Sequence, residues 1–348
     1  MNKLYRHCIK CLLPEQIPGA DIDECGICYN CRHPKPSLTP PQETVEKLER
    51  ILRNIKGSHK GKYDGIVTLS GGKDSTYLLY KLAKEYNLRI LAFTVNVALP
   101  ETALENIYRT VRMLKVEHIL YVPDLEFHKK LFNYLLRNQK KAGAEKTVCD
   151  ICSHLVWGYA AKFAAEKKIP FLFSGYGPGQ FAGEMPREPV FGFIPTEGDF
   201  AEISGMRKTG FFSEEDLRKF WNSADYPAEA IPVHLAPLQV WEYHQSKIMD
   251  MVDELGLVVS RKKANPVCTN CEFIWFFMYS DLKKLGYISY NENFSQLIRE
   301  GKASKFEWLF ILPILKFAIR HKLFWASSIK KIMKMLEISD KDLRITGK

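Results

Sequence analysis

One short run of the sequence carries the groups needed to hold phosphate. It lies between an apolar, strand-like run at 63–69 and a helical pattern at 74–86. Two adjacent glycines let the backbone turn tightly and point amide hydrogens at an anion, and the helix that follows adds the positive end of its dipole. The lysine adds a positive charge, the serines add hydroxyl donors, and the aspartate suits Mg²⁺. The residues of this predicted phosphate-binding loop are Ser70, Gly71, Gly72, Lys73, Asp74 and Ser75.

The residue order in this loop resembles that of one enzyme family. The loop lacks the G-x-x-x-x-G-K-[ST] pattern of Walker nucleotide triphosphatases. It resembles instead the S-G-G-x-D-S motif of the PP-loop ATP pyrophosphatases, and the resemblance in fold covers about residues 60–175. That family cleaves ATP between the α and β phosphates, adenylates an acceptor oxygen and releases pyrophosphate, and ammonia or sulfur then displaces AMP. The resemblance therefore implies ATP and Mg²⁺ as ligands of this chain.

The same resemblance assigns roles to further residues. It implies that the loop grips pyrophosphate and that its aspartate takes part in catalysis. The family forms its adenine pocket from backbone near the end of the second strand, which here is Thr94, Val95 and Asn96. It usually ends the fourth strand with a glycine and a metal-binding aspartate. The matching stretch, Ser174–Gly177, contains Gly175 but no aspartate.

Four cysteines near the N-terminus have the spacing of a zinc site. Cys8 and Cys11 form one C-x-x-C pair, Cys28 and Cys31 form another, and 16 residues separate the pairs. Two such pairs predict a tetrahedral Zn²⁺ site, which would supply much of the folding energy of so short a segment. The surrounding sequence, CIKCLLP and then DIDECGICYNC, resembles the start of bacterial sugar amidotransferases. In that comparison Cys25 falls on a position that binds no metal.

Two further C-x-x-C pairs lie inside the chain and have two interpretations. Cys149 and Cys152 precede a helical pattern, and Cys268 and Cys271 follow more than a hundred residues later. The four could form a second structural zinc site. They also resemble the cysteines of the tRNA thiolation branch of the PP-loop family, in which three cysteines hold a [4Fe–4S] cluster with one open iron. Cys149, Cys152 and Cys268 match those three, and Cys271 departs from the pattern.

These patterns favour an adenylating group-transfer enzyme. Sulfur transfer to a tRNA base or a small molecule is the leading interpretation, with a sulfur-donor protein as a partner. The alternative is an amidotransferase that delivers ammonia to a nucleotide-linked N-acetyl sugar in surface-glycan (lipopolysaccharide) synthesis, with an ammonia-supplying protein as a partner. A third interpretation, a non-catalytic zinc and nucleic-acid-binding module, is disfavoured by the intact loop. The acceptor and any oligomeric state remain open.

The order of predicted elements indicates an α/β fold. Strands that alternate with helices of 10–15 residues form a parallel sheet covered by helices on both faces, and ligands bind beyond the carboxyl ends of its strands. We therefore expect a doubly wound sheet of the PP-loop type, an N-terminal zinc ribbon and a mainly helical C-terminal region. The predicted strands are 63–69, 89–97, 118–122 and 170–173, and the predicted helices are 43–56, 74–86, 101–114 and 153–167.

Composition divides the chain into five segments. Four prolines in residues 33–42 indicate a stiff linker, and the stretch 174–200 is rich in Gly and Pro and reads as a long functional loop. The expected divisions are 1–32 (zinc ribbon), 33–56 (linker and helix), 57–200 (ATP pyrophosphatase domain), 201–300 (acceptor and helical region) and 301–348 (basic amphipathic tail).

The hydropathy and charge of the chain indicate where in the cell we expect the protein. The chain has 348 residues, 46% hydrophobic and 26% charged, which excludes a disordered or collagen-like chain. The longest uncharged apolar run is eight residues, 308–315, whereas a membrane-spanning helix needs about 20. We therefore expect a cytoplasmic protein.

The last 48 residues hold 11 Lys and Arg against 4 Asp and Glu, so +7 of the net +10 lies there. This tail predicts contact with an anionic surface, either nucleic acid or a membrane periphery.

Overall fold

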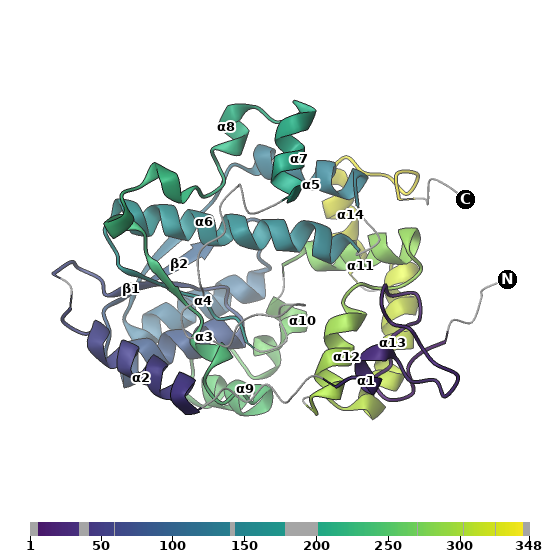
Figure 1. Ribbon diagram of the computed structural model, residues 1–348, viewed down its shortest axis with the longest axis horizontal. Helices are drawn as coiled ribbons and strands as arrows, with labels where there is room; N and C mark the ends of the chain where they lie inside the picture. The colour runs from purple at the N-terminus through teal and green to yellow at the C-terminus, as the bar shows by residue number, and fades with distance from the viewer. Residues whose placement is uncertain are drawn as a thin grey trace.

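A parallel sheet forms the centre of the protein (Figure 1). The computed structural model describes residues 6–34, 42–58, 60–139, 143–177, 201–269, 271–301, 303–323 and 325–343. The five strands pair in the order β3-β2-β1-β4-β5, and every pairing is parallel. This arrangement confirms the predicted α/β class. The strands are β1 (Gly65–Thr68), β2 (Ile90–Val95), β3 (Glu117–Tyr121), β4 (Phe171–Phe173) and β5 (Val233–Leu235).

The strand order places a topological switch point between β1 and β4. From β1 the chain adds β2 and β3 on one side, whereas β4 and β5 lie on the other side. Connections that leave β1 and β4 at their carboxyl ends therefore diverge, and such a switch point is where open α/β sheets bind ligands. The segment 70–75 follows β1 and the segment 174–177 follows β4. β5 lies beyond residue 200, so the sheet also includes part of the 201–300 segment.

Helices cover both faces of the sheet (Figure 1). On one face, buried leucines of α2 and α3 pack with the sheet in a cluster that also includes Ile107 of α4 and Val252 of α9. α3 continues as a π-helix, η1, so the helix expected at 74–86 has two geometries. The elements of this face are α2 (Gln42–Ile55), α3 (Lys73–Tyr80), η1 (Lys81–Glu85), α4 (Glu101–Leu114) and α9 (Gln245–Glu254).

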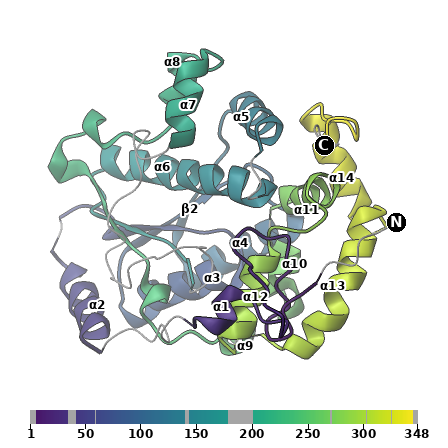
Figure 2. The same cartoon turned by 45° about the vertical axis from the view of Figure 1, so that its right-hand side comes forward.

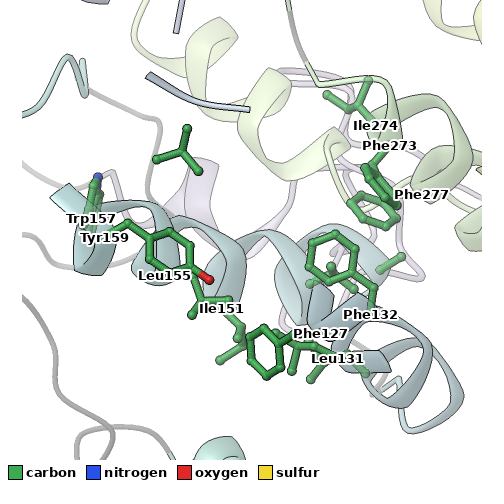
Figure 3. Packing of buried hydrophobic residues seen from close by; sticks show 14 of the residues in the cluster. Phe127, Leu131, Phe132, Ile151, Leu155, Trp157, Tyr159, Phe273, Ile274 and Phe277 are labelled. Carbon is green, nitrogen blue, oxygen red and sulfur yellow. The ribbon is translucent and has the colours of Figure 1, made fainter. Parts of the chain in front are cut away.

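A larger aromatic core covers the other face (Figure 3). Phe132 of α5 meets Phe273 of α11 edge to face at 4.9 Å, and Ile151 and Leu155 of α6 lie beside them. Residues 273–279 are all buried, so this aromatic run packs in the core. The elements of this face are α5 (Leu125–Arg137), the π-helix η2 (Glu145–Cys149), α6 (Asp150–Glu166), α11 (Phe273–Lys284) and α14 (Ala326–Met335).

The N-terminal segment packs against the C-terminal helices. Leu13 and Ile17 share a small cluster with Tyr287, Leu285 and Ile298. Among the described residues, no helix is long and apolar enough to cross a bilayer. The remaining elements are α1 (Tyr29–Arg32), α7 (Ala201–Thr209), α8 (Glu214–Leu217), η4 (Ser223–Asp225), η5 (Ala228–Ala230), η6 (Pro237–Gln239), η7 (Lys262–Ala264), α10 (Pro266–Thr269), α12 (Asn291–Arg299) and α13 (Lys305–Arg320).

Candidate phosphate site and cysteine clusters

Two glycines shape the phosphate loop. Gly71 has φ +76°, a conformation that L side chains rarely adopt, and a Cβ at this position would collide with the backbone carbonyl of Ala103. Gly72 is extended and precedes the first residue of α3, and no side chain caps this end of the helix. The first backbone N–H groups of α3 therefore have no side-chain cap, and N–H groups at such a helix start can bind an anion.

The two serines close the loop on itself. The backbone N–H of Ser70 donates to Oγ of Ser75 at 3.1 Å, and the two hydroxyl oxygens also lie 3.1 Å apart. The Ser75 hydroxyl reaches the carbonyl of Gly72 at 3.3 Å. The structure thus brings the predicted residues 70–75 together as one tight turn at the carboxyl end of β1.

A buried asparagine ties this loop to the rest of the fold. Nδ2 of Asn106 donates to the carbonyls of Gly71 and Lys263, both at 3.0 Å. Its Oδ1 accepts from the N–H of Val259 at 3.0 Å, and the side chain is fully buried. Because all three bonds are to backbone groups, Asn106 fixes the loop relative to the 259–263 segment. The sequence analysis did not identify this residue.

The lysine and aspartate of the loop form a network with a distant tyrosine. Nζ of Lys73 forms an ion pair with Oδ2 of Asp74 at 2.5 Å, and both side chains are buried. Lys73 also donates to the hydroxyl of Tyr243 at 3.0 Å, and that hydroxyl donates to Oδ1 of Asp74 at 3.0 Å. Burial and the neighbouring Asp74 charge raise the pKa of Tyr243, so it stays a protonated donor. Tyr243 is a second residue that sequence reasoning missed.

The end of β4 closes against the loop at the switch point. A Cβ at Gly175 would lie 2.8 Å from Cα and 2.9 Å from N of Ser75, so only glycine allows this approach. A Cβ at Gly177 would lie 2.8 Å from the ring of Tyr243. Nε2 of Gln239 holds this segment by donating to the carbonyls of Tyr176 and Gly177 at 3.0 and 2.8 Å. Gly175 therefore lies where the sequence predicted. Residues 178–200 of the expected long loop lie outside the described residues.

The predicted adenine-contacting residues end β2 beside the loop. The hydroxyl of Thr94 donates to the carbonyl of Leu69 at 2.7 Å. Nε2 of His118 lies 2.9 Å from the same Thr94 hydroxyl. The N–H of Asn96 donates to the carbonyl of Tyr121 at 2.8 Å. Val95, between them, is buried as the last residue of β2. The side chain of Thr94 thus positions the strand that carries the loop.

The four N-terminal cysteines form one compact group. The Sγ atoms of Cys8, Cys11, Cys28 and Cys31 all lie within 4.8 Å of one another, and three of the side chains are buried. Burial raises the pKa of Cys28 to about 11, and a cation bound between the sulfurs would favour its thiolate. Nη1 of Arg299 lies 3.3 Å from the Cys11 sulfur. This group has the ligands and spacing to hold a metal ion.

The inner cysteines form no group as compact as the N-terminal one within the described residues. Burial raises the pKa of Cys152, and the charge of nearby Cys271 raises it further. The Cys149 sulfur lies 3.7 Å from the hydroxyl of Tyr290. Cys268 belongs to the short helix α10. Within the described part of the chain, the N-terminal group is the only set of three or more His, Cys, Asp or Glu ligand atoms that lies within 4.8 Å.

Thr269 lies near the phosphate loop, and Glu272 is bonded to the chain just after β2. A Cβ at Gly72 would lie 3.5 Å from Oγ1 of Thr269, which directly follows Cys268. The N–H of Glu272 donates to the carbonyl of Ala98, just after β2, at 3.0 Å. This second C-x-x-C segment therefore runs from the phosphate loop along the end of β2.

Comparisons with known proteins find solved structures only. No protein family and no curated protein matches the chain. It is similar over 99% of its length to the U34-tRNA thiolase NcsA from Methanococcus maripaludis with its [4Fe–4S] cluster, at 16% identity and TM-score 0.38, covering 92% of that chain. It is similar over 89% to NMN synthetase from Francisella tularensis, at 13% identity and TM-score 0.37, covering 98% of that chain. For an NH₃-dependent NAD synthetase from Campylobacter jejuni the match covers 88% of this chain and 98% of the other, at 12% identity and TM-score 0.35.

What the chain itself shows is an α/β protein whose parallel sheet holds a glycine-rich phosphate loop at its switch point and a four-cysteine group near its N-terminus.

Proposed function

We propose that this protein is a PP-loop ATP pyrophosphatase that adenylates an acceptor and forms AMP and pyrophosphate. The observation that carries the proposal is the approach of Gly175 to Ser75, which joins the end of β4 to the turn after β1. It supports a closed phosphate cradle at the switch point, built from backbone amides and an uncapped helix start.

The proposed reaction is a displacement at the α-phosphorus of ATP. An acceptor oxygen forms a bond to that phosphorus while the bond to the bridging oxygen breaks, and pyrophosphate leaves. Mg²⁺ would neutralise charge on the leaving group, and Asp74 is the carboxylate of the loop that could hold it. Lys73 would then move from its ion pair with Asp74 to a phosphate oxygen. Tyr243 is placed to orient both side chains, since it contacts each at 3.0 Å.

We propose sulfur transfer as the second half of the reaction, and this step rests on the inner cysteines. A [4Fe–4S] cluster holds its thiolates farther apart than a single zinc ion does. Cys149, Cys152 and Cys268 match the three ligands of the tRNA thiolation branch, and among the described residues the inner cysteines lack the compact spacing of the N-terminal group. Such a cluster would supply sulfur to the adenylated acceptor, a tRNA base or a small molecule. The contact of Thr269 with the loop supports delivery at the phosphate site.

The N-terminal head supports the alternative, transfer of ammonia to a nucleotide-linked sugar. Its cysteine pattern resembles that of sugar amidotransferases, and the structure gathers those four residues into a metal-binding group. We propose Zn²⁺ as the ion, because four cysteine ligands at tetrahedral spacing are typical of structural zinc sites.

Anaerobic purification of single-cysteine variants separates the two transfers. Under the sulfur proposal, Cys149→Ala, Cys152→Ala and Cys268→Ala each remove a brown chromophore, bound iron and sulfur transfer, while Cys271→Ala keeps all three. Cys25→Ala, a change at an exposed cysteine outside both groups, is the control. A colourless wild-type protein with two zinc ions per chain would contradict sulfur transfer and favour ammonia-dependent sugar amidation. Failure to turn over ATP with either acceptor class would favour a non-catalytic zinc and nucleic-acid-binding module.

A further inference from the structure

The helix α13 exposes an apolar face to solvent. Phe306, Phe310, Ile314 and Phe317 recur at helical spacing and are each between 56% and 71% exposed. Soluble proteins rarely leave so many large apolar side chains together without a binding role. Figure 2 shows α13 along the right-hand margin of the molecule, next to α14. This face is therefore accessible at the edge of the fold.

The opposite face of the same helix is already packed. Leu312 and Ile319 are buried, and Trp308 stacks on Phe294 of α12 at 4.1 Å. α13 is thus apolar on both sides, whereas a surface helix of a soluble domain has a polar outer face. Packing among the described residues accounts for one side only, so the outer side is open to a partner.

Positive charge borders the apolar face. α13 contains Lys305, Lys316 and Arg320 but one acidic residue, Glu307. On a helical projection the three basic residues lie along one flank of the apolar stripe. They lie beside the exposed phenylalanines, not among them. An apolar face with a cationic flank matches the interface of a membrane that contains anionic lipid, where rings enter the acyl boundary and cations meet phosphates.

Two other occupants fit less well. Single-stranded RNA binds to grooves that mix cationic side chains with stacking rings, whereas the cations of α13 lie on one flank of the exposed apolar stripe and none lies between its rings. In an antiparallel two-fold pair of copies, the basic flanks would lie side by side with only Glu307 to neutralise them. Charge complementarity therefore favours an anionic lipid surface.

We propose that the outer face of α13 docks the protein onto an anionic lipid bilayer, with Phe306, Phe310 and Phe317 inserted at the interface. The helix has 16 residues, too short to span a bilayer but long enough to lie in its surface. This inference is independent of the chemistry proposed for the phosphate loop. It gives the enzyme a membrane-peripheral position.

Sedimentation with lipid vesicles tests the proposal on the full-length protein. Wild-type protein should bind vesicles of phosphatidylcholine with about one third phosphatidylglycerol, and bind phosphatidylcholine alone at least about tenfold more weakly. The combined change of Phe306, Phe310 and Phe317 to Ser should weaken binding to the anionic vesicles by at least about tenfold, because the inserted rings are lost. Phe211→Ser removes a phenylalanine of similar exposure, 50%, outside α13 and should leave binding unchanged.

A charge variant and the oligomeric state complete the test. Lys305→Glu with Arg320→Glu should remove the preference for anionic vesicles, and Lys84→Glu, an exposed change elsewhere, should not. Wild-type protein that ignores both vesicle types would overturn the proposal, as would a triple serine variant that binds like wild type. A dimer in analytical ultracentrifugation that the serine variant abolishes would assign the face to a second copy instead. If the triple serine variant lost only tRNA binding, the outer face of α13 would be assigned to RNA.

Discussion

The hydroxyl of Tyr243 donates a 3.0 Å hydrogen bond to Asp74, although the two residues lie 169 positions apart in the sequence. The same hydroxyl accepts from Lys73 at 3.0 Å. A segment from late in the chain therefore sets the orientation of the two charged groups in the phosphate loop. The loop motif alone is not the whole site, because its charged side chains depend on a residue outside it.

Removal of this hydroxyl should weaken ATP turnover without unfolding the protein. Tyr243→Phe keeps the ring but leaves Lys73 and Asp74 without their shared partner. Hydrogen bonds to charged groups contribute about 1.5–3 kcal/mol, so we expect kcat/KM for ATP to fall by at least about tenfold. Tyr108→Phe, on the exposed side of α4, should have no effect. Equal kinetics for the two variants would remove Tyr243 from the site.

A methyl group at Gly175 should disturb the phosphate loop directly. In Gly175→Ala the new Cβ meets the Ser75 backbone at 2.8–2.9 Å, which forces the start of α3 to move. Overpacking of this kind costs about 1–3 kcal/mol of unfolding free energy, and we expect Mg·ATP affinity to fall by at least about tenfold in calorimetric titration. Gly205→Ala, which meets no atom within 4 Å, is the control and should bind ATP as wild type does. Normal affinity in Gly175→Ala would show that this contact does not shape the site.

The N-terminal group should hold one metal ion per chain. Cys8→Ser removes a buried ligand and should release the zinc that survives mild chelation, as measured by elemental analysis. Cys25→Ser changes an exposed cysteine outside the group and should keep the zinc. Because the metal supplies folding energy to a short segment, Cys8→Ser should also expose that segment to proteolysis. Retained zinc in Cys8→Ser, or lost zinc in Cys25→Ser, would show a different ligand set.

A buried aspartate should make stability depend on pH. Asp281 is fully buried, and burial raises its pKa to about 6, although it accepts hydrogen bonds from Ser289 at 2.5 and 2.9 Å and from the Ala144 N–H at 2.6 Å. A carboxyl whose folded pKa is raised contributes stability that is fully present below its unfolded pKa, about 3.9, and is lost as pH rises through the folded value.

The matching measurement compares wild type with Asp281→Asn in urea unfolding from about pH 4 to pH 7. The amide cannot titrate, so the difference between the two unfolding free energies isolates Asp281. At about 1.4 kcal/mol per pKa unit, wild type should lose up to about 3 kcal/mol relative to the variant as pH rises. A difference that stays constant, or that grows in favour of wild type, would contradict the raised pKa.

Local patterns predicted much of this fold. The apolar spacing of 101–114 predicted the bounds of α4 as they are observed. Three of the four predicted strands are one to three residues longer than the observed ones, and the strand predicted at 118–122 is observed one residue earlier, because strand ends depend on ladder partners that no local pattern shows. α5 was missed although its signal is present, since Asp124 caps it by accepting from the N–H groups of Glu126 and Phe127. β5 was missed because it has three residues and is strand only through pairing with β4.

The candidate site likewise contains residues that the sequence predicts and residues that it does not. The loop at 70–75 was predicted because its function depends on adjacent residues, and the N-terminal cysteines because metal ligands impose a spacing on the chain. Asn106 and Tyr243 could not be predicted, because their roles arise from tertiary contacts and no neighbouring residue marks them.

Analysis of the nucleotide products tests the central proposal most directly. Protein incubated with Mg·ATP should be given pooled tRNA with sulfide in one reaction and nucleotide-linked N-acetyl sugars with ammonium in another, and the nucleotides separated by ion-exchange chromatography. The proposal predicts AMP and pyrophosphate in equal amounts with at least one acceptor, and their loss in Asp74→Ala with the fold retained. ADP and orthophosphate as products, or AMP formation that persists in Asp74→Ala, would contradict it.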